Sequence, residues 1–249
     1  MNELADSLER LLADVSSPAV VREVDRGGSP GGLWQALEDS GFLDAMVPEA
    51  DGGAGLSLAD AFELFVLHGK YAVPVPLAPT IVARALGLEQ LPRELGAVVT
   101  AAQIVGAIER TLELTLAFAN QRVQFGRPIG KFQVIQQQLA VMAEQAAAAR
   151  TAAQIGCHSD GFLVDPLRAA VAKSRTSEAA AIVGPMAHAI HGAIGITAEL
   201  DLQLFTRRLH QWRAEYGSEL AWNRVLGRAL IASGSPLSLD FMRDALLPH

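Results

Sequence analysis

Apolar residues recur at helical spacing through most of this chain. One run repeats at every fourth residue, at Ile104, Ile108, Leu112 and Leu116. A second run has steps of four, three and four, at Ile135, Leu139, Met142 and Ala146. Such spacing places apolar side chains on one face of an α-helix, and alternating strand-like segments are nearly absent. The pattern predicts an all-α protein.

Prolines and glycines divide the first part of the chain. An amphipathic helix is predicted at the start, from the spacing of Leu4, Leu8, Leu11 and Val15. Residues 27–32 then predict a loop, and a second helix begins near Leu33. Ser57, with Asp60 three residues later, is suited to cap a further helix. Residues 73–79 contain three prolines and predict an extended turn.

The short segment 86–97 precedes a long uninterrupted helical pattern and marks the predicted domain boundary. We expect an N-terminal helical domain over residues 1–95 and a C-terminal domain over residues 96–249. The second domain is predicted to be a four-helix bundle, with helices over about 98–120, 133–157, 166–190 and 217–232. Pro166 suits the first turn of its helix, where a proline nitrogen costs no hydrogen bond.

Charge and cysteine usage exclude several classes of function. The formal net charge is −7 and the basic residues form no long run, so a nucleic-acid partner is not expected. No apolar run approaches the roughly 20 residues that span a bilayer, so no membrane association is expected. Cys157 is the only cysteine and cannot form an intrachain disulfide. We therefore expect a cytoplasmic protein.

The most specific motif is the segment 122–133, which reads RVQFGRPIGKFQ. It closes one predicted helix and opens the next, with Gly126 and Pro128 in the turn. The guanidinium of Arg122 at a helix end is suited to a diphosphate, because it presents paired donors to phosphate oxygens. The residues alone also allow a simple helical hairpin with Phe125 and Phe132 in the core.

This motif resembles the signature of the acyl-CoA dehydrogenase family, where it lies between two helices of the C-terminal four-helix domain. The resemblance implies that Arg122, Phe125 and Gln133 contact an FAD bound mainly by a neighbouring subunit. Residues 33–43, 47–49 and 52–57 are similar to the first helical domain of that family. The resemblance thus covers nearly the whole chain.

A second motif, residues 191–197, resembles the later glycine-rich turn of the same family. It implies that Gly192, Ala193 and Gly195 approach the diphosphate of the cofactor, since glycine brings no Cβ. This chain has Ala189 and Ala193 where the family has glutamine and glycine. An ordinary loop at a helix end is the alternative interpretation.

Full-length members of the family insert a β-sheet domain between the two helical regions, and that domain is missing here. In the family's reaction a carboxylate removes the α-proton of an acyl-CoA thioester while the β-hydrogen leaves as hydride to the flavin. The usual base lies between a tyrosine and a glycine, but here Gly217 directly follows Tyr216. A second position used in some members aligns with Gly96.

Glu215 is the best candidate for a base in this chain, and Glu219 is the other carboxylate nearby. The residues alone also allow Glu215 to be a solvated side chain in a turn. The histidines show no spacing typical of a metal site, so no metal is expected.

The resemblance implies an oxidoreductase of lipid metabolism: a flavin-dependent acyl-CoA dehydrogenase that oxidises a thioester to its α,β-unsaturated form. The chain would act in a homo- or hetero-oligomer with another acyl-CoA dehydrogenase-like subunit, which could supply the β-domain and the base. The alternative is a non-catalytic scaffold that retains the helical interface without flavin.

Overall fold

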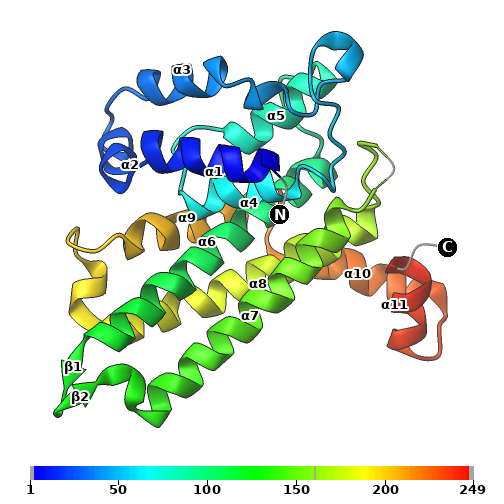
Figure 1. Cartoon of the computed structure of the whole chain (residues 1–249). Helices are drawn as coiled ribbons and strands as arrows, with labels where there is room; N and C mark the ends of the chain where they lie inside the picture. The colour runs from blue at the N-terminus through cyan, green and yellow to red at the C-terminus, as the bar shows by residue number, and fades with distance from the viewer. Residues whose placement is uncertain (1–2, 160, 247–249) are drawn as a thin grey trace.

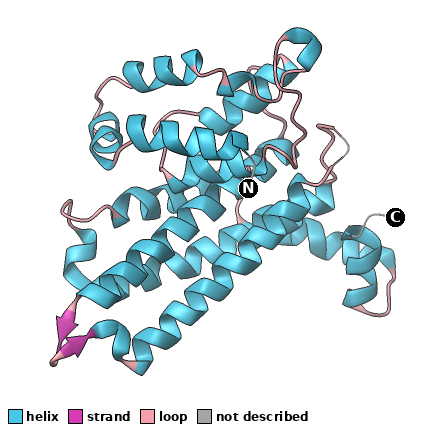
Figure 2. Ribbon diagram, in the orientation of Figure 1, coloured by secondary structure: helices cyan, strands magenta, loops and turns pink. Residues whose placement is uncertain are grey.

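A computed structural model describes residues 3–159 and 161–246 of the chain. It is 74% helical with 2% strand, which confirms the all-α prediction. Figure 2 shows that the strands form one small hairpin at an end of the molecule. Figure 1 shows the N-terminal helices lying above a layer of long helices from the second half of the chain.

The described residues up to Leu86 form five α-helices and two short 3₁₀ turns (Figure 1). They are α1 (Glu3–Val15), α2 (Pro18–Asp25), α3 (Gly31–Asp39), η1 (Phe42–Asp44), η2 (Glu49–Asp51), α4 (Phe62–Lys70) and α5 (Leu77–Leu86). The predicted first helix is present, but α2 follows it before the 27–32 loop. Ser17 caps α2 by accepting from the Val20 N–H, and Pro18 is in its first turn, signals that the prediction overlooked.

Two local predictions around α4 and α5 differ from the structure. The Ser57 hydroxyl donates to the Asp60 carboxylate at 2.6 Å, and the Asp60 N–H donates back at 3.2 Å. These bonds stabilise a turn before α4, but the N-cap of α4 is Ala61 and has no side-chain cap, so Ser57 does not cap this helix. The extended turn predicted over residues 73–79 is too long, because α5 begins at Leu77. Pro79 lies in the first turn of α5, where N–H groups have no partner inside the helix.

The second half of the chain is formed by α6 (Arg93–Gln121), α7 (Gln133–Cys157), α8 (Pro166–His191), α9 (Leu202–Ala214), α10 (Glu219–Ser233) and α11 (Ser238–Leu246). α6, α7 and α8 pack against one another, as the predicted bundle requires. The prediction omitted α9, which packs on α6 and α8, and used the segment of α10 as the fourth helix. α10 packs on α8 and leads to α11, at the right of Figure 1.

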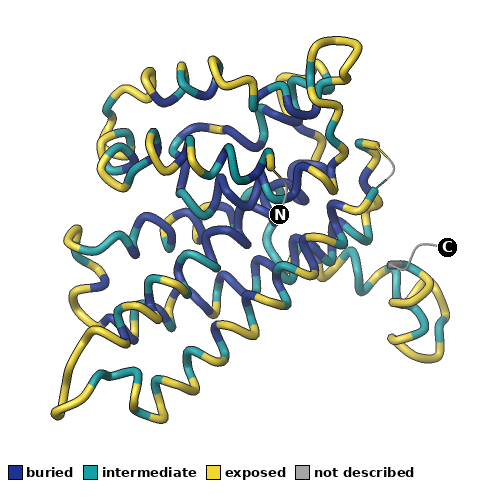
Figure 3. Tube along the Cα trace, in the orientation of Figure 1, coloured by how far each residue is buried: buried dark blue, intermediate teal, exposed yellow. Residues whose placement is uncertain are grey.

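The core is continuous from the N-terminal helices to the long helices, with α6 at its centre (Figure 3). α4 and α6 cross in direct backbone contact. A Cβ at Gly69 would lie 1.9 Å from the carbonyl oxygen of Gln103, and one at Gly106 would lie 1.9 Å from that of Val66. Because one core joins both halves, the division at residues 95 and 96 stays a prediction. α6 itself begins at Arg93.

Within residues 3–159 and 161–246, two helical segments could cross a membrane by length and composition alone: Arg93–Gln121 and Pro166–Ile196. The most apolar 18-residue stretch of the first segment is 83% buried inside the molecule. The corresponding stretch of the second segment is 44% buried. A core helix passes the same test, and α6 occupies the core here.

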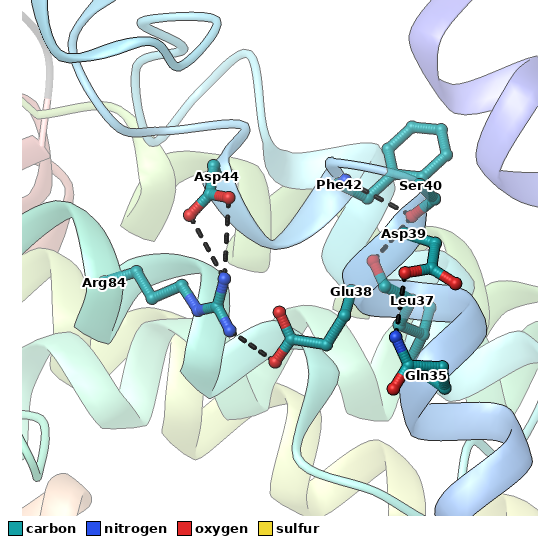
Figure 4. Close-up of polar contacts among 8 residues, drawn as sticks. All are labelled: Gln35, Leu37, Glu38, Asp39, Ser40, Phe42, Asp44 and Arg84. Atoms are coloured by element: carbon teal, nitrogen blue, oxygen red, sulfur yellow. Dashed lines mark hydrogen bonds and ion pairs between the residues drawn. The ribbon is translucent and has the colours of Figure 1, made fainter.

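Ion pairs connect helices that are distant in the sequence. Arg150 on α7 donates to Glu63 at 2.6 Å and to Glu109 at 2.7 Å, which joins α4, α6 and α7. Within the N-terminal region, Figure 4 shows Arg84 on α5 between Glu38, at 2.5 Å, and Asp44, at 3.3 Å. These contacts stabilise the arrangement of the helices around the core.

Candidate functional site

The 122–133 motif forms the tip of the α6–α7 hairpin. β1 (Val123–Gln124) pairs antiparallel with β2 (Arg127–Pro128). Phe125 and Gly126 make the turn between them, both with positive φ (51° and 80°), as a tight two-residue hairpin requires. The 3₁₀ turn η3 (Ile129–Lys131) then leads into α7.

The interpretation that places Phe125 in the core is wrong, because its side chain is 92% exposed. Its ring makes a T-shaped contact with the ring of Phe132, with the centroids 6.1 Å apart. The hairpin turn directs Phe125 away from the bundle, so packing inside this chain does not account for the aromatic ring.

A pocket of about 460 Å³ opens beside this tip. Its lining includes the side chains of Phe118, Arg122, Phe125, Phe132 and His191. Tertiary structure therefore brings the 122–133 motif together with the start of the 191–197 motif. Gln133 begins α7 and is exposed, but it does not line this pocket.

The tip carries positive charge without acidic partners. Among the residues that the structure describes, Arg122, Arg127 and Lys131 form no ion pair. The Arg127 guanidinium lies over the ring of Phe132, 4.3 Å from its centroid. In a chain of net charge −7, three cations with no compensating carboxylate favour an anionic ligand at this end of the bundle.

The glycines of the 191–197 motif have structural explanations of their own. Gly192 ends α8 with φ 65°, and its N–H donates to the carbonyl of His188. Gly195 is buried, and a Cβ there would lie 2.7 Å from the Cβ of His191. Ala193 is exposed on the 3₁₀ turn η4 (Gly192–Ile196). The turn follows His191, which lines the pocket, but backbone conformation and close packing within this chain already explain both glycines.

Sequence reasoning missed a stacked pair that forms part of the pocket wall. The rings of Phe118 on α6 and His191 at the end of α8 lie 4.3 Å apart at 25°. Burial lowers the pKa of His191, whereas its hydrogen bond to the carbonyl of Ala187 acts in the opposite direction. No local pattern relates Phe118 to His191, because the contact depends on how α6 and α8 pack.

Glu215, the candidate base, lies at the end of α9 and lines a different pocket, of about 360 Å³, with His68 and Arg208. Its carboxylate accepts a hydrogen bond from Gln211 at 2.8 Å. The structure does not bring it together with Arg122.

Glu219, the other carboxylate considered, is held by two hydrogen bonds from Arg213, one of them 2.9 Å long. These bonds lower the pKa of Glu219 and keep it in an ion pair.

The two positions that the family resemblance assigns to a base lie side by side, and neither carries a carboxylate. A Cβ at Gly96 would be 2.2 Å from Cε1 of Tyr216. Tyr216 has a positive φ of 54°, and its carbonyl accepts from the indole N–H of Trp222 at 3.1 Å. The Tyr216 ring therefore occupies the space next to Gly96 where a side chain would stand.

The side chain of Lys173 on α8 hydrogen-bonds to the last turn of α9, a contact that sequence reasoning missed. The side chain is fully buried, and its ammonium donates to the carbonyls of Trp212 and Arg213 at 2.9 and 3.0 Å and to the Ser177 hydroxyl at 3.0 Å. Burial lowers the pKa of Lys173 to about 8, although Glu215 and Glu219 act to raise it. The ammonium satisfies carbonyls that the helix end leaves free.

Among the described residues, no group of three or more His, Cys, Asp or Glu side chains could hold a metal ion. The pocket at the tip combines aromatic rings with the guanidinium of Arg122, and Arg127 and Lys131 lie on the same hairpin. Together with the helical architecture, these features are those of the helical domains of the acyl-CoA dehydrogenase class of oxidoreductases. In the part of the chain that the structure describes, no β-sheet domain lies between the N-terminal helices and α6.

The chain belongs to the acyl-CoA dehydrogenase family of oxidoreductases, because family models match nearly all of it. Residues 1–92 match the acyl-CoA dehydrogenase N-terminal domain and residues 93–230 match the C-terminal domain. The chain is 31% identical to acyl-CoA dehydrogenase IpdE2 of Mycobacterium tuberculosis over 234 residues, which cover 80% of this chain and 72% of the relative.

A second relative, acyl-CoA dehydrogenase IpdE2 of Mycolicibacterium smegmatis, is 28% identical, with 83% of this chain and 91% of the relative covered. Among solved structures, the ChsE4–ChsE5 complex from Mycobacterium tuberculosis contains a chain with a TM-score of 0.83 at 18% identity. That match covers 94% of this chain and 97% of the other, and at this identity it shows the fold alone.

Proposed function

We propose that this chain is a subunit of a flavin-dependent acyl-CoA dehydrogenase that oxidises an acyl-CoA thioester to its α,β-unsaturated form. Its part is to complete the FAD site of another acyl-CoA dehydrogenase-like subunit, in a homo- or hetero-oligomer. The observation that carries the proposal is the tip pocket, where Phe125 is exposed and Arg122 has no acidic partner among the residues that the structure describes. We expect the complex to act in the cytoplasm.

The residues at the tip fit FAD. Arg122 would hold the diphosphate, with Arg127 adding positive charge, and the rings of Phe125 and Phe132 would pack against the nucleotide. Gly192 has open space where a Cβ would stand, so the adjacent turn leaves room for a ligand. When bound, FAD accepts the hydride from the substrate.

The base and the β-domain are proposed to come from the partner. Glu215 lines a separate pocket, Glu219 is paired with Arg213, and Tyr216 occupies the space next to Gly96. A partner that keeps the family's full architecture would bring both missing elements. ChsE4–ChsE5, which shares this fold, is a complex of two differently named subunits, and this makes such an arrangement reasonable here.

The test replaces Arg122 by alanine and measures FAD content in the reconstituted complex. Loss of one charged hydrogen-bonding partner of a phosphate costs about 1.5–3 kcal/mol, which is about a tenfold or greater loss of affinity. Arg228→Ala is the control, because Arg228 is exposed on α10 away from the tip pocket. Arg150→Ala would be unsuitable as a control, because Arg150 forms ion pairs with Glu63 and Glu109 that join three helices.

Circular dichroism and the melting temperature of both variants separate loss of FAD from loss of fold. Unchanged FAD content in a folded Arg122→Ala complex would make Arg122 structural and overturn the proposal.

The second candidate is a non-catalytic scaffold that retains the helical interface without flavin. The position of Tyr216 against Gly96 favours it, because this chain then lacks a base at both family positions. The visible absorbance of the protein distinguishes the two candidates. It is measured after purification alone and after co-expression with neighbouring dehydrogenase-like genes, and only the flavin-dependent subunit acquires a flavin spectrum in the second case.

A further inference from the structure

The last two helices, α10 and α11, form an arm that extends beyond the bundle. Figure 1 shows this arm and the hairpin tip at opposite ends of the molecule. The matched C-terminal family domain ends at residue 230, and α11 begins only at Ser238. Trp222 is the last buried residue among those that the structure describes (Figure 3). The helix α11 therefore lies outside both the matched domain and the core.

A pocket of about 210 Å³ lies where the arm meets α8. Its walls come from α8, α10 and α11, and they include Leu167, Val171, Leu226, Leu230, Phe241 and Ala245. Phe241 and Ala245 are four residues apart on α11, so they share the face of that helix that lines the pocket. The polar side chain in the lining is Ser238, and none of the described lining residues is charged.

The lining favours an apolar ligand over water. A buried water needs about two to four polar partners, whereas this lining offers one hydroxyl. Apolar walls that face empty space lose dispersion contacts, which an apolar ligand restores. A cavity of about 150 Å³ with a lining of this kind is already large enough to bind benzene. The pocket is therefore suited to a small apolar group that carries no charge inside it.

Gly227 contributes to the free space. It lies within α10 and lines the pocket, and nothing lies within 4 Å of the place where its Cβ would stand. Glycine inside a helix is less favourable than alanine, because it has more backbone freedom to lose on folding. No close packing requires the glycine at this position, whereas a large side chain there would fill part of the pocket.

We propose that the pocket between the arm and α8 binds a small apolar molecule or the hydrocarbon tail of an amphipathic one, such as an alcohol or a fatty acid. The polar end of such a ligand would remain in solvent, because the lining provides no charged partner for it. A bound ligand would fill the space between α11 and α8 and hold the arm on the bundle. The site does not depend on the proposed flavin function, since it lies at the other end of the molecule.

The test measures the dissociation constants of butanol, hexanol and octanol for the purified full chain by isothermal titration calorimetry. Each methylene group that leaves water contributes about 0.8 kcal/mol, which is about fourfold in affinity. We therefore expect saturable binding of one alcohol molecule per chain, with affinity that rises about fourfold per methylene group. Affinity independent of chain length, or no binding of octanol at millimolar concentration, would overturn the proposal. Octanoate in place of octanol tests whether a charged end is tolerated, and we expect similar affinity.

Two variants fill the pocket from different helices. Gly227→Leu should remain folded, because leucine favours a helix more than glycine does. We expect octanol to bind this variant at least about tenfold more weakly, since two or more methylene groups lose their place. Ala245→Leu fills the pocket from α11 and should have the same effect. Ala232→Leu is the matched control, because Ala232 is exposed on α10 and does not line the pocket.

Circular dichroism confirms that each variant is folded, and equal octanol affinity in the wild type and both filling variants would overturn the site. A side chain from a second copy is the competing occupant, because Ile231, Leu237 and Leu239 of the arm region are exposed. Sedimentation of the wild type and Gly227→Leu, with and without octanol, distinguishes the two. An oligomer that both octanol and Gly227→Leu dissociate would assign the pocket to protein contact and overturn the ligand proposal. An oligomeric state that neither changes would support it.

Discussion

The ring of Tyr216 lies against the backbone of Gly96, so closely that a Cβ at position 96 would be 2.2 Å from Cε1 and 2.3 Å from Cζ of the ring. Gly96 is in the first turns of α6, and Tyr216 follows α9, so the contact joins the start of one long helix to the end of another. It also brings together the two positions at which the family resemblance places a catalytic base. A side chain at position 96 requires Tyr216 to move.

The first prediction is that Gly96→Ala destabilises the protein by about 1–3 kcal/mol, the usual cost of overpacking a core. Thermal or urea unfolding measures the change. Gly227→Ala is the control: Gly227 is in α10 with nothing within 4 Å of its missing Cβ, so alanine there should be neutral or slightly stabilising. Adding Tyr216→Ala should reduce the cost of Gly96→Ala, and additive effects in this double-mutant cycle would contradict the contact.

The second prediction is that the isolated chain has little or no activity toward acyl-CoA thioesters. No carboxylate occupies a family base position, and Glu215 and Glu219 are engaged by Gln211 and Arg213. The measurement is turnover with an artificial electron acceptor and added FAD. Substantial turnover by the pure chain would contradict the subunit proposal. Comparison of Glu215→Gln with Glu219→Gln would then identify the base as the residue whose loss abolishes the rate.

The third prediction is that the protein associates through the hairpin tip. Phe125 is 92% exposed, Val123 in the same motif is 55% exposed, and Val134, directly after the motif, is 62% exposed. Such a grouping of exposed apolar side chains favours an interface. Light scattering at micromolar concentration should show a dimer or a larger species, alone or with the partner subunit. Phe125→Asn should shift the equilibrium toward the monomer, since asparagine tolerates the positive φ of this position but buries little apolar area. A monomer that no partner changes would contradict the proposal.

The fourth prediction concerns acid sensitivity and His68. This side chain is 3% exposed, and its Nδ1 accepts a hydrogen bond from the Ala78 N–H at 3.1 Å. Burial, with Arg208 nearby, lowers the pKa of His68 from 6.5 to about 3. Between these values the unfolded chain binds the proton more readily, so stability is complete above pH 6.5 and is lost as the pH falls toward 3.

The loss attributable to His68 between pH 7 and pH 5 is about 2 kcal/mol. Urea unfolding at the two pH values measures it. His68→Gln keeps a polar group that does not titrate and should remove most of this pH dependence. If the variant and the wild type lose the same free energy of unfolding over this range, His68 is not the responsible group.

Local signals in the sequence are sufficient for much of the helical architecture. The helix Gln133–Cys157 has the predicted bounds, and α8 begins at Pro166 as predicted, because periodicity and first-turn preferences depend on neighbouring residues. The helix α9 is absent from the prediction because its apolar pattern is interrupted. Arg208 interrupts the apolar pattern but is 8% exposed and pairs with Asp25 on α2, a partner that no local window contains.

The sequence by itself determined the family, the helical class and the motif residues, since these depend on residue identity and short-range spacing. Only the tertiary structure decided which of these residues share a site. The packing of α6 against α8 stacks His191 on Phe118, the two-residue hairpin turn exposes Phe125, and the end of α9 places Tyr216 on Gly96. Each of these contacts joins separate helices or depends on how a turn leaves the bundle. Long-range packing sets such geometry, and no local pattern of residues encodes it.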